Sequence, residues 1–278
     1  MKLNVSSSAI ALALALVAAP ALAADLGSIK DTYEEPPPPV VSWTGFYLSA
    51  GLGGSYMFTD LDGGVGAYDD VAPFTEFAFV GAAGNAGAAN FFGTVGLGYD
   101  FQVAPKWLFG VLADYDFASS QDASVSGGGA LLNGLGAAAV TVSSEMGDTW
   151  SVGARLGYLI NQRTLVYAMG GYSEAEFSLV GSVEGSLGTD FGPYSVSSGK
   201  SWRQGYFVGG GLETMLAENL SAKLEYRYAQ YDGESFDVED TFSVNGNGGD
   251  VIGGASMSDP DVHSIRAALS WRFGNWGR

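Results

Sequence analysis

The sequence contains no cysteine, so the fold cannot depend on disulfide bonds. It contains one histidine, His263, which leaves no Cys–His pair and very little support for a Ser–His–Asp arrangement. Lys and Arg number 12 against 30 Asp and Glu, the opposite of the balance that nucleic-acid binding needs. Beyond the N-terminus, no stretch is apolar for the roughly eighteen residues that a membrane helix requires. We therefore expect no catalytic residue, no cofactor, no nucleic-acid partner and no helical membrane anchor.

The N-terminus has the pattern of a secretory signal peptide over residues 1–23. Lys2 precedes an apolar run over residues 9–19, and Ala21-Leu22-Ala23 supplies a small-x-small cleavage site. We expect cleavage near Ala23. The next segment, residues 24–42, is acidic and contains four consecutive prolines at 36–39, which favours an extended periplasmic leader.

Alternation of apolar with small or polar residues is the main pattern in the rest of the chain. In residues 91–117 it continues through two arms joined by a short turn at residues 103–106. A period of two over about eleven residues predicts strands, and tilted strands of that length match a hydrocarbon layer. The same pattern predicts eight strands, over residues 43–58, 91–102, 107–117, 149–160, 165–177, 202–216, 220–228 and 262–273.

The connections between these strands are of two kinds. Three are tight turns near Pro105, Gln162 and Glu218. The other four are long and cover residues 59–90, 118–148, 178–201 and 232–261. Short turns at one end and long loops at the other are typical of an outer-membrane barrel, and an even number of strands returns both termini to the periplasmic side.

A soluble lipocalin-like barrel would show the same alternation with its apolar face inside. Two features favour the membrane. The non-apolar face is rich in glycine, which suits a narrow lumen, and aromatic residues lie towards both ends of the apolar face as two girdles. We therefore predict an all-β fold: a closed antiparallel eight-stranded transmembrane β-barrel over residues 43–273, monomeric, with four long extracellular loops and a tail at 274–278.

Several strand segments resemble a known family. They are TGFYLSAGLGGSYMF, TLVYAMGGYSEAEF, LSAKLEYRYAQYDG and IRAALSWRF, which resemble the small OmpA-like, porin-family surface barrels of alphaproteobacteria. The resemblance implies an outer-membrane surface antigen that the barrel-assembly machinery recognises through its last strand. Such barrels usually end on an aromatic residue, whereas Phe273 is followed here by five residues, so Phe273 and Trp276 are both candidates for that signal. Some relatives are described as haemin-binding.

Charged residues occur on the strand faces that we expect to point inward. These are Asp100, Asp114, Asp116, Arg155, Glu174, Glu176, Arg203, Glu213, Lys223, Glu225, Arg227, Arg266 and Arg272. An eight-stranded barrel has an interior just wide enough for side chains, so such charges must pair. They predict either a salt-bridged plug, which we favour, or a narrow polar pore.

The long loops are acidic. Asp60 and Asp62, and Asp237, Glu239 and Asp240, are weak candidates for ligands of a divalent cation, and a solvated acidic rim is the favoured interpretation. We expect a structural surface barrel surrounded by lipid and lipopolysaccharide, whose loops meet divalent cations or host molecules. The alternatives are a small passive pore, or loop-mediated binding of haemin or of a host surface.

Overall fold

The computed structural model describes residues 42–69, 76–119, 121–130, 137–186, 190–244 and 247–273. The expected signal peptide, the tail with Trp276, and all of the leader except Ser42 lie outside these ranges. Within the described ranges, no helix is long and apolar enough to cross a membrane.

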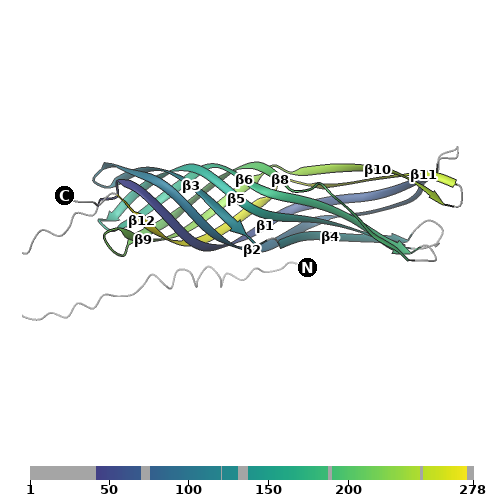
Figure 1. Cartoon of the computed structure of the whole chain (residues 1–278), viewed down its shortest axis with the longest axis horizontal. Helices are drawn as coiled ribbons and strands as arrows, with labels where there is room; N and C mark the ends of the chain where they lie inside the picture. Colours follow the sequence, from purple (N-terminus) through teal and green to yellow (C-terminus); the bar gives the residue numbers. More distant parts are fainter. Residues whose placement is uncertain are drawn as a thin grey trace, which may run out of the picture. The chain divides into compact units, whose positions relative to one another are not determined.

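The described residues form twelve strands, which pair with one another in antiparallel fashion (Figure 1). They are β1 (Gly45–Asp69), β2 (Glu76–Ala104), β3 (Trp107–Ala118), β4 (Gln121–Ala130), β5 (Ala137–Asn161), β6 (Thr164–Ser186), β7 (Asp190–Ser197), β8 (Ser201–Met215), β9 (Leu220–Tyr231), β10 (Glu234–Val244), β11 (Asn247–Met257) and β12 (Asp261–Arg272).

The hydrogen-bonded strands form a ring. Its order is β1–β12–β9–β8–β6–β5–β3–β2, and β2 pairs again with β1. The first and last strands therefore meet, with Tyr47 opposite Arg272 and Phe58 opposite Asp261. Because every strand of the ring has two partners, its backbone donors and acceptors are satisfied by the neighbouring strands.

The expectation of eight strands joined by four long loops is wrong for the loops. Strands β1, β2, β5 and β6 continue far beyond the ring. There β11 pairs with β1, β4 with β5 and β7 with β6, while β10 pairs with β11 (Figure 1). The extended segments are rich in glycine, alanine and serine, whose small side chains give little contrast between an apolar and a polar face. The alternation of apolar and polar residues is therefore weak in these segments, although their backbones are paired as strands.

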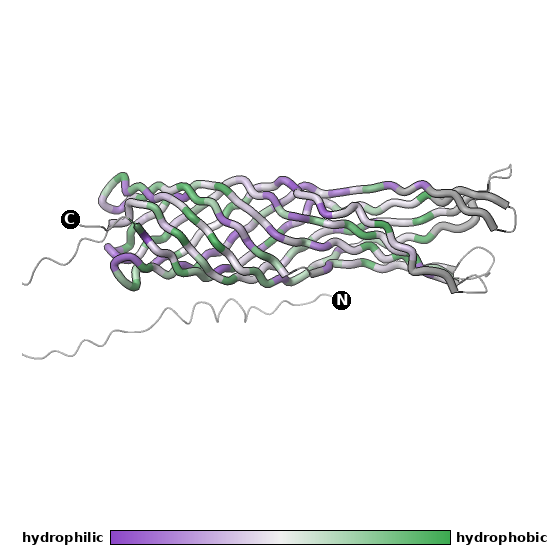
Figure 2. The backbone as a smooth tube through the Cα atoms, in the orientation of Figure 1, coloured by the Kyte–Doolittle hydropathy of each residue, from purple (hydrophilic) through white to green (hydrophobic). Residues whose placement is uncertain are grey.

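The two faces of the ring differ in polarity, as the alternating hydropathy along its strands indicates (Figure 2). In β3 the outward residues Trp107, Phe109 and Val111 alternate with the buried Leu108 and Leu112. Large apolar side chains are exposed all round the ring; they include Phe46, Leu48, Leu52, Phe91, Leu97, Phe101, Phe117, Leu156, Ile160, Val208, Leu224, Ile265, Leu269 and Trp271. An exposed apolar band of this extent marks contact with lipid or with another protein.

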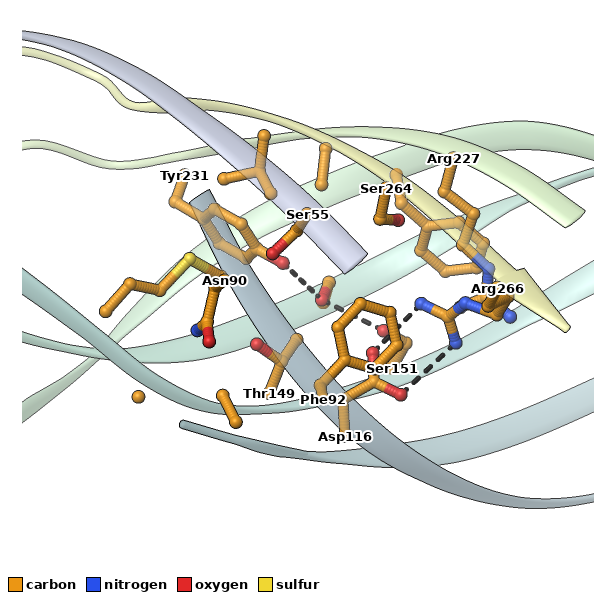
Figure 3. A pocket seen from close by; sticks show the side chains of 17 residues that line it. Ser55, Asn90, Phe92, Asp116, Thr149, Ser151, Arg227, Tyr231, Ser264 and Arg266 are labelled. Carbon is orange, nitrogen blue, oxygen red and sulfur yellow. Dashed lines mark hydrogen bonds and ion pairs between the residues drawn. The ribbon is translucent and has the colours of Figure 1, made fainter. Parts of the chain in front are cut away.

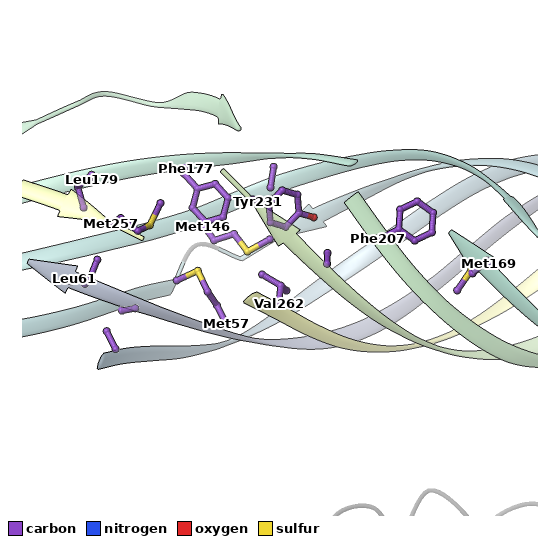
Figure 4. Close-up of a cluster of buried hydrophobic side chains, with 14 of the residues drawn as sticks. Met57, Leu61, Met146, Met169, Phe177, Leu179, Phe207, Tyr231, Met257 and Val262 are labelled. Atoms are coloured by element: carbon purple, nitrogen blue, oxygen red, sulfur yellow. The ribbon is translucent and has the colours of Figure 1, made fainter. Parts of the chain in front are cut away.

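Beyond the ring, the strands form two facing sheets. One contains β10, β11 and the ends of β1 and β2; the other contains β4, β5, β6 and β7. Side chains pack between them, since the Ser144 hydroxyl on β5 donates a hydrogen bond to Met257 Sδ on β11 at 2.9 Å. Met57, Leu61, Met146, Leu179 and Met257 are among the buried residues drawn in this region (Figure 4). We call these two sheets the extension.

Candidate functional site

The interior of the ring contains a network of buried ion pairs. Its side chains come from β2, β3, β5, β8, β9 and β12, so the network joins strands on different sides of the ring. Each strand contributes from the face opposite its exposed apolar residues, because successive side chains of a strand point to opposite faces. The network consists of two groups of residues.

The first group contains two carboxylates and two guanidinium groups. Arg155 on β5 bonds Asp100 on β2 through Nε at 2.9 Å and Nη2 at 2.5 Å, and it bonds Glu213 on β8 at 3.0 Å. Arg272 on β12 bonds the same two acids, at 2.7 Å to Asp100 and 2.8 Å to Glu213. The Ser221 hydroxyl donates a further bond to Glu213 at 2.5 Å. Both acids are thus shared between both cations.

Aromatic rings enclose this first group. The Arg155 guanidinium lies 4.7 Å from the centre of the Tyr47 ring and 4.9 Å from that of Tyr167. Arg272 lies 4.5 Å from the Trp43 ring and donates a hydrogen bond to the Trp43 carbonyl at 3.0 Å. Stacking of this kind suits the planar guanidinium group and fixes its position.

The second group is centred on two arginines. Arg227 on β9 forms two hydrogen bonds with Asp114 on β3, at 2.9 and 2.8 Å. Arg266 on β12 bonds Asp114 at 3.1 Å and Asp116 at 2.9 Å. Glu225 lies 3.3 Å from Arg227 Nη2 and 3.8 Å from Arg266 Nε. Carboxylates and guanidinium groups therefore alternate across this part of the interior.

Glu225 connects the two groups. It pairs with Lys223 at 3.2 Å and accepts a hydrogen bond from the Tyr167 hydroxyl at 2.6 Å, while the Tyr167 ring lies against Arg155. Among the described residues, the network balances five cations with five carboxylates: Arg155, Lys223, Arg227, Arg266 and Arg272 against Asp100, Asp114, Asp116, Glu213 and Glu225. Balance is required because an unpaired charge in such a buried setting is strongly destabilising.

A small cavity lies beside the second group (Figure 3). It has a volume of about 40 Å³, with Asp116, Arg227 and Arg266 on its wall. Its polar lining also includes Ser55, Asn90, Thr149, Ser151, Ser173, Tyr231 and Ser264. Ser151, Ser173 and Tyr231 are linked by hydrogen bonds of 3.0 Å. A cavity of this size and polarity has room for ordered water.

Apolar residues bound the network on two sides. Towards the short turns, Trp43, Leu108, Leu159, Leu165 and Met215 are buried. Towards the extension, the buried residues include Met57, Met146, Phe177, Tyr231 and Val262 (Figure 4). The ion pairs therefore occupy a polar middle layer between two apolar layers, a combination that fills the ring with packed side chains.

Two carboxylates and one arginine that we expected to point inward do not join the network. Glu174 and Glu176 lie on the face of β6 opposite its buried residues Ser173, Ala175 and Phe177. The sequence pattern misassigned the faces of this strand because both faces carry apolar residues, and for the same reason it did not assign Tyr167 to the interior. Arg203 on β8 pairs instead with Glu234 on β10.

The two outward carboxylates have other partners. Glu174 accepts hydrogen bonds from Trp150 Nε1 at 3.1 Å and from the Tyr172 hydroxyl at 2.5 Å. Glu176 accepts one from Lys200 at 2.9 Å, and this bond raises the pKa of Lys200. These carboxylates are therefore tied to aromatic and basic groups on the outer surface, and not to the interior arginines.

The candidate metal ligands are divided between two strands of the extension. Asp60 and Asp62 lie in β1, whereas Asp237, Glu239 and Asp240 lie in β10. The Asp60 carboxylate accepts a hydrogen bond from the Asn85 amide. Within the described ranges, no group of three or more His, Cys, Asp or Glu residues has the arrangement of a metal site.

His263 lies among aromatic residues near the start of β12. Its Nδ1 is 2.7 Å from the Tyr226 hydroxyl, and its ring centre is 5.3 Å from that of Tyr228. The Tyr228 hydroxyl in turn donates a hydrogen bond to Asp261 at 2.6 Å. Among the described side chains, the partners of this histidine are aromatic residues and not a serine hydroxyl, so the arrangement does not resemble a nucleophilic triad.

The ring of paired strands has an exposed apolar band and an ion-paired interior. A family model matches the sequence that forms it. The model describes an outer membrane protein beta-barrel domain, and it matches residues 9–273. The chain belongs to this outer membrane β-barrel family.

Two outer-membrane proteins are similar in sequence to this chain over most of its length. The 31 kDa outer-membrane immunogenic protein of Brucella melitensis biotype 1 is 28% identical over 275 residues, which cover 93% of this chain and 96% of the relative. The 22 kDa outer membrane protein of Rhizobium leguminosarum bv. viciae is 26% identical over 206 residues, covering 74% of this chain and 72% of the relative. The chain is accordingly an outer-membrane protein of the Gram-negative type.

Solved structures similar to the chain include an outer membrane protein and an attachment protein. OprG of Pseudomonas aeruginosa is 14% identical, with a TM-score of 0.31, and the match covers 83% of this chain and 97% of OprG. The attachment invasion locus protein Ail of Yersinia pestis is 13% identical, with a TM-score of 0.26, covering 81% of this chain and 99% of Ail.

Proposed function

We propose that the ring of strands is a closed eight-stranded transmembrane barrel that serves as a structural, non-conducting surface protein of the outer membrane. The observation that supports this most directly is the filled interior, in which a charge-balanced ion-pair network lies between two apolar layers. The exposed apolar band contacts lipid, and closure of the ring satisfies the backbone within it. The protein works as a monomer and has no catalytic role.

The proposed topology places the short turns in the periplasm and the extension outside the cell. β1 begins and β12 ends at the same end as the short turns, which supports periplasmic termini.

Processing and partners follow from this topology. The signal peptide is removed near Ala23, the leader at 24–42 stays in the periplasm, and the last strand directs assembly. Lipopolysaccharide surrounds the barrel, and the acidic extension meets cations or host molecules. The word "immunogenic" in the relative's name supports exposure at the surface.

A passive pore is the competing function, and ion conductance separates the two. We expect folded wild-type protein in a planar lipid bilayer to show no steady current, because packed apolar layers close both sides of the network. A heat-modifiability gel on the same sample verifies that the barrel is folded. A steady, reproducible current from folded wild-type protein would contradict the structural function and favour transport.

The topology can be tested by labelling cysteines on intact cells. Ser126 on β4 is exposed in the extension, whereas Gln162 is exposed in the turn between β5 and β6. We expect Ser126→Cys to react with an impermeant maleimide and Gln162→Cys to react only after the cells are lysed. The wild-type chain has no cysteine, so it is an unlabelled control. Labelling of Gln162→Cys on intact cells would reverse the proposed orientation.

A further inference from the structure

The extension has a closed side and an open side. On the closed side β4 meets β2, where Gly127 lies so near the backbone of Gly81 and Ala82 that a Cβ at this position would overlap it. On the open side are β7 and β10. In the described part of the chain, β7 pairs only with β6 and β10 pairs only with β11. One backbone edge of each of these strands is therefore without a strand partner.

Two apolar side chains of β7 point towards the inside of the extension. Val196 is opposite Gly181 on β6, and Tyr194 is opposite Val183. Directly opposed residues share a face of the sheet, and a Cβ on Gly181 would lie 3.6 Å from Phe236 on the facing sheet. Tyr194 and Val196 therefore point towards the core of the extension, yet their side chains remain exposed, at 66% and 44%.

Exposed apolar side chains beside an unpaired strand edge are unusual in native proteins, because such edges invite pairing with another chain. An extended segment that pairs with β7 would form main-chain hydrogen bonds along this edge. Every second side chain of that segment would lie over Tyr194, Val196 and the partly buried Phe236. The open side thus has both the backbone and the apolar contacts that one added strand requires.

The charge of the extension determines the chemistry of the added strand. Residues 59–90, 118–148, 178–199 and 232–261 contain eighteen Asp and Glu residues and no Lys or Arg. Glu184 on β6 and Asp237 and Glu239 on β10 are exposed near the open side. The negative electrostatic potential of these residues attracts cations and repels a second copy of the same chain.

One buried carboxylate oxygen adds to this preference. Glu234, at the start of β10, pairs with Arg203 through Oε1, and its side chain is 7% exposed. Its other oxygen, Oε2, is buried without a hydrogen-bond partner among the described residues. Glu234 therefore adds one more carboxylate at the start of β10, the strand that borders the open side.

We infer that the open side between β7 and β10 binds an extended segment of a partner protein in which apolar and basic residues alternate. The segment adds a strand to β7, covers Tyr194 and Val196, and places its basic side chains among the acids of the extension. This inference goes beyond the structural role, and its biological use requires the extension to lie outside the cell.

The inference can be tested with the folded full-length chain in a zwitterionic detergent and an eight-residue peptide of alternating Lys and Val, which matches the length of β7. We expect saturable binding by fluorescence anisotropy, together with slower amide hydrogen exchange in residues 190–197. A peptide that has the same composition but four Lys followed by four Val should bind less tightly. So should an alternating peptide with N-methylated backbone nitrogens, because it cannot donate to the edge.

Matched variants separate the open side from general electrostatic attraction. Val196→Lys should weaken binding of the alternating peptide roughly tenfold or more, because it places a like charge beside the added strand. Ile252→Lys adds the same charge at an exposed position on the outer face of β11 and should change the affinity much less. Equal loss in both variants, or equal binding of all three peptides, would overturn the inference.

Two further results would also overturn it: no slowing of exchange in β7, or dimers of the peptide-free protein that protect β7. Because this experiment uses purified protein, its outcome does not depend on orientation in the membrane. Failure of the proposed topology would appear in the labelling of Ser126→Cys and Gln162→Cys and not in these measurements.

Discussion

Replacing Arg155 with methionine is expected to lower the free energy of unfolding by about 3–5 kcal/mol, the range for removing one partner of a buried ion pair. Methionine keeps most of the side-chain volume but removes the cation that Asp100 and Glu213 share. Arg272 then remains as the only cation of the first group, facing two buried carboxylates. Urea titration of the folded protein, followed by tryptophan fluorescence, measures the loss.

Two controls make this result specific to the network. Arg163→Met removes a cation of the same kind from the exposed turn between β5 and β6 and should change stability little. Combining Arg155→Met with Glu213→Gln restores equal numbers of charges in the first group, so part of the lost stability should return. If Arg155→Met is as mild as Arg163→Met, water must reach the network, and the interior is not a closed plug.

Leu97→Arg is expected to impair folding of the barrel into lipid by roughly 2–4 kcal/mol, the cost of a cation at the lipid midplane of a barrel. Leu97 lies on the outer face of β2 and is 55% exposed within the apolar band. In water an exposed arginine would be harmless at such a position. The expected penalty therefore arises only if hydrocarbon surrounds the band. Folding into lipid vesicles, scored by heat-modifiable gel migration across a urea series, measures it.

The same strand supplies the matched control. Ala83 is exposed on the same face of β2 but lies in the extension, beyond the band. Ala83→Arg adds the same side chain and should fold into lipid as well as the wild type. Equal impairment by both substitutions would mean that the apolar band does not mark the membrane. Equal tolerance would mean that Leu97 faces something other than lipid.

The sequence by itself determined that the chain is built from antiparallel strands with one apolar face. Residues 91–117 alternate so regularly that both arms and the turn between them could be predicted. In the structure they are the last part of β2 and nearly all of β3, joined by Pro105 and Lys106. This is possible because the period of a strand is a local property, and burial of one face gives it a strong contrast of polarity.

Only the tertiary structure decided which charges meet. Arg155 and Glu213 are 58 residues apart, and Arg272 and Asp100 are 172 apart. Their contacts depend on the stagger between strands around the ring, which periodicity does not contain. The face of β6 could not be assigned either, because Leu165 and Tyr167 on one face are matched by Val166 and Tyr172 on the other. Contact across the interior resolves this choice.

The extension, too, was decided by tertiary contacts. Its strands contain so many glycine, alanine and serine residues that neither propensity nor alternation marks them as strands in the sequence. They are held as strands by pairing with β1, β5 and β6 and with one another, and by packing between two sheets, as where Gly63 lies close to Val142. Pairing and packing join residues that are distant in sequence, so the chain must be folded before either can be seen.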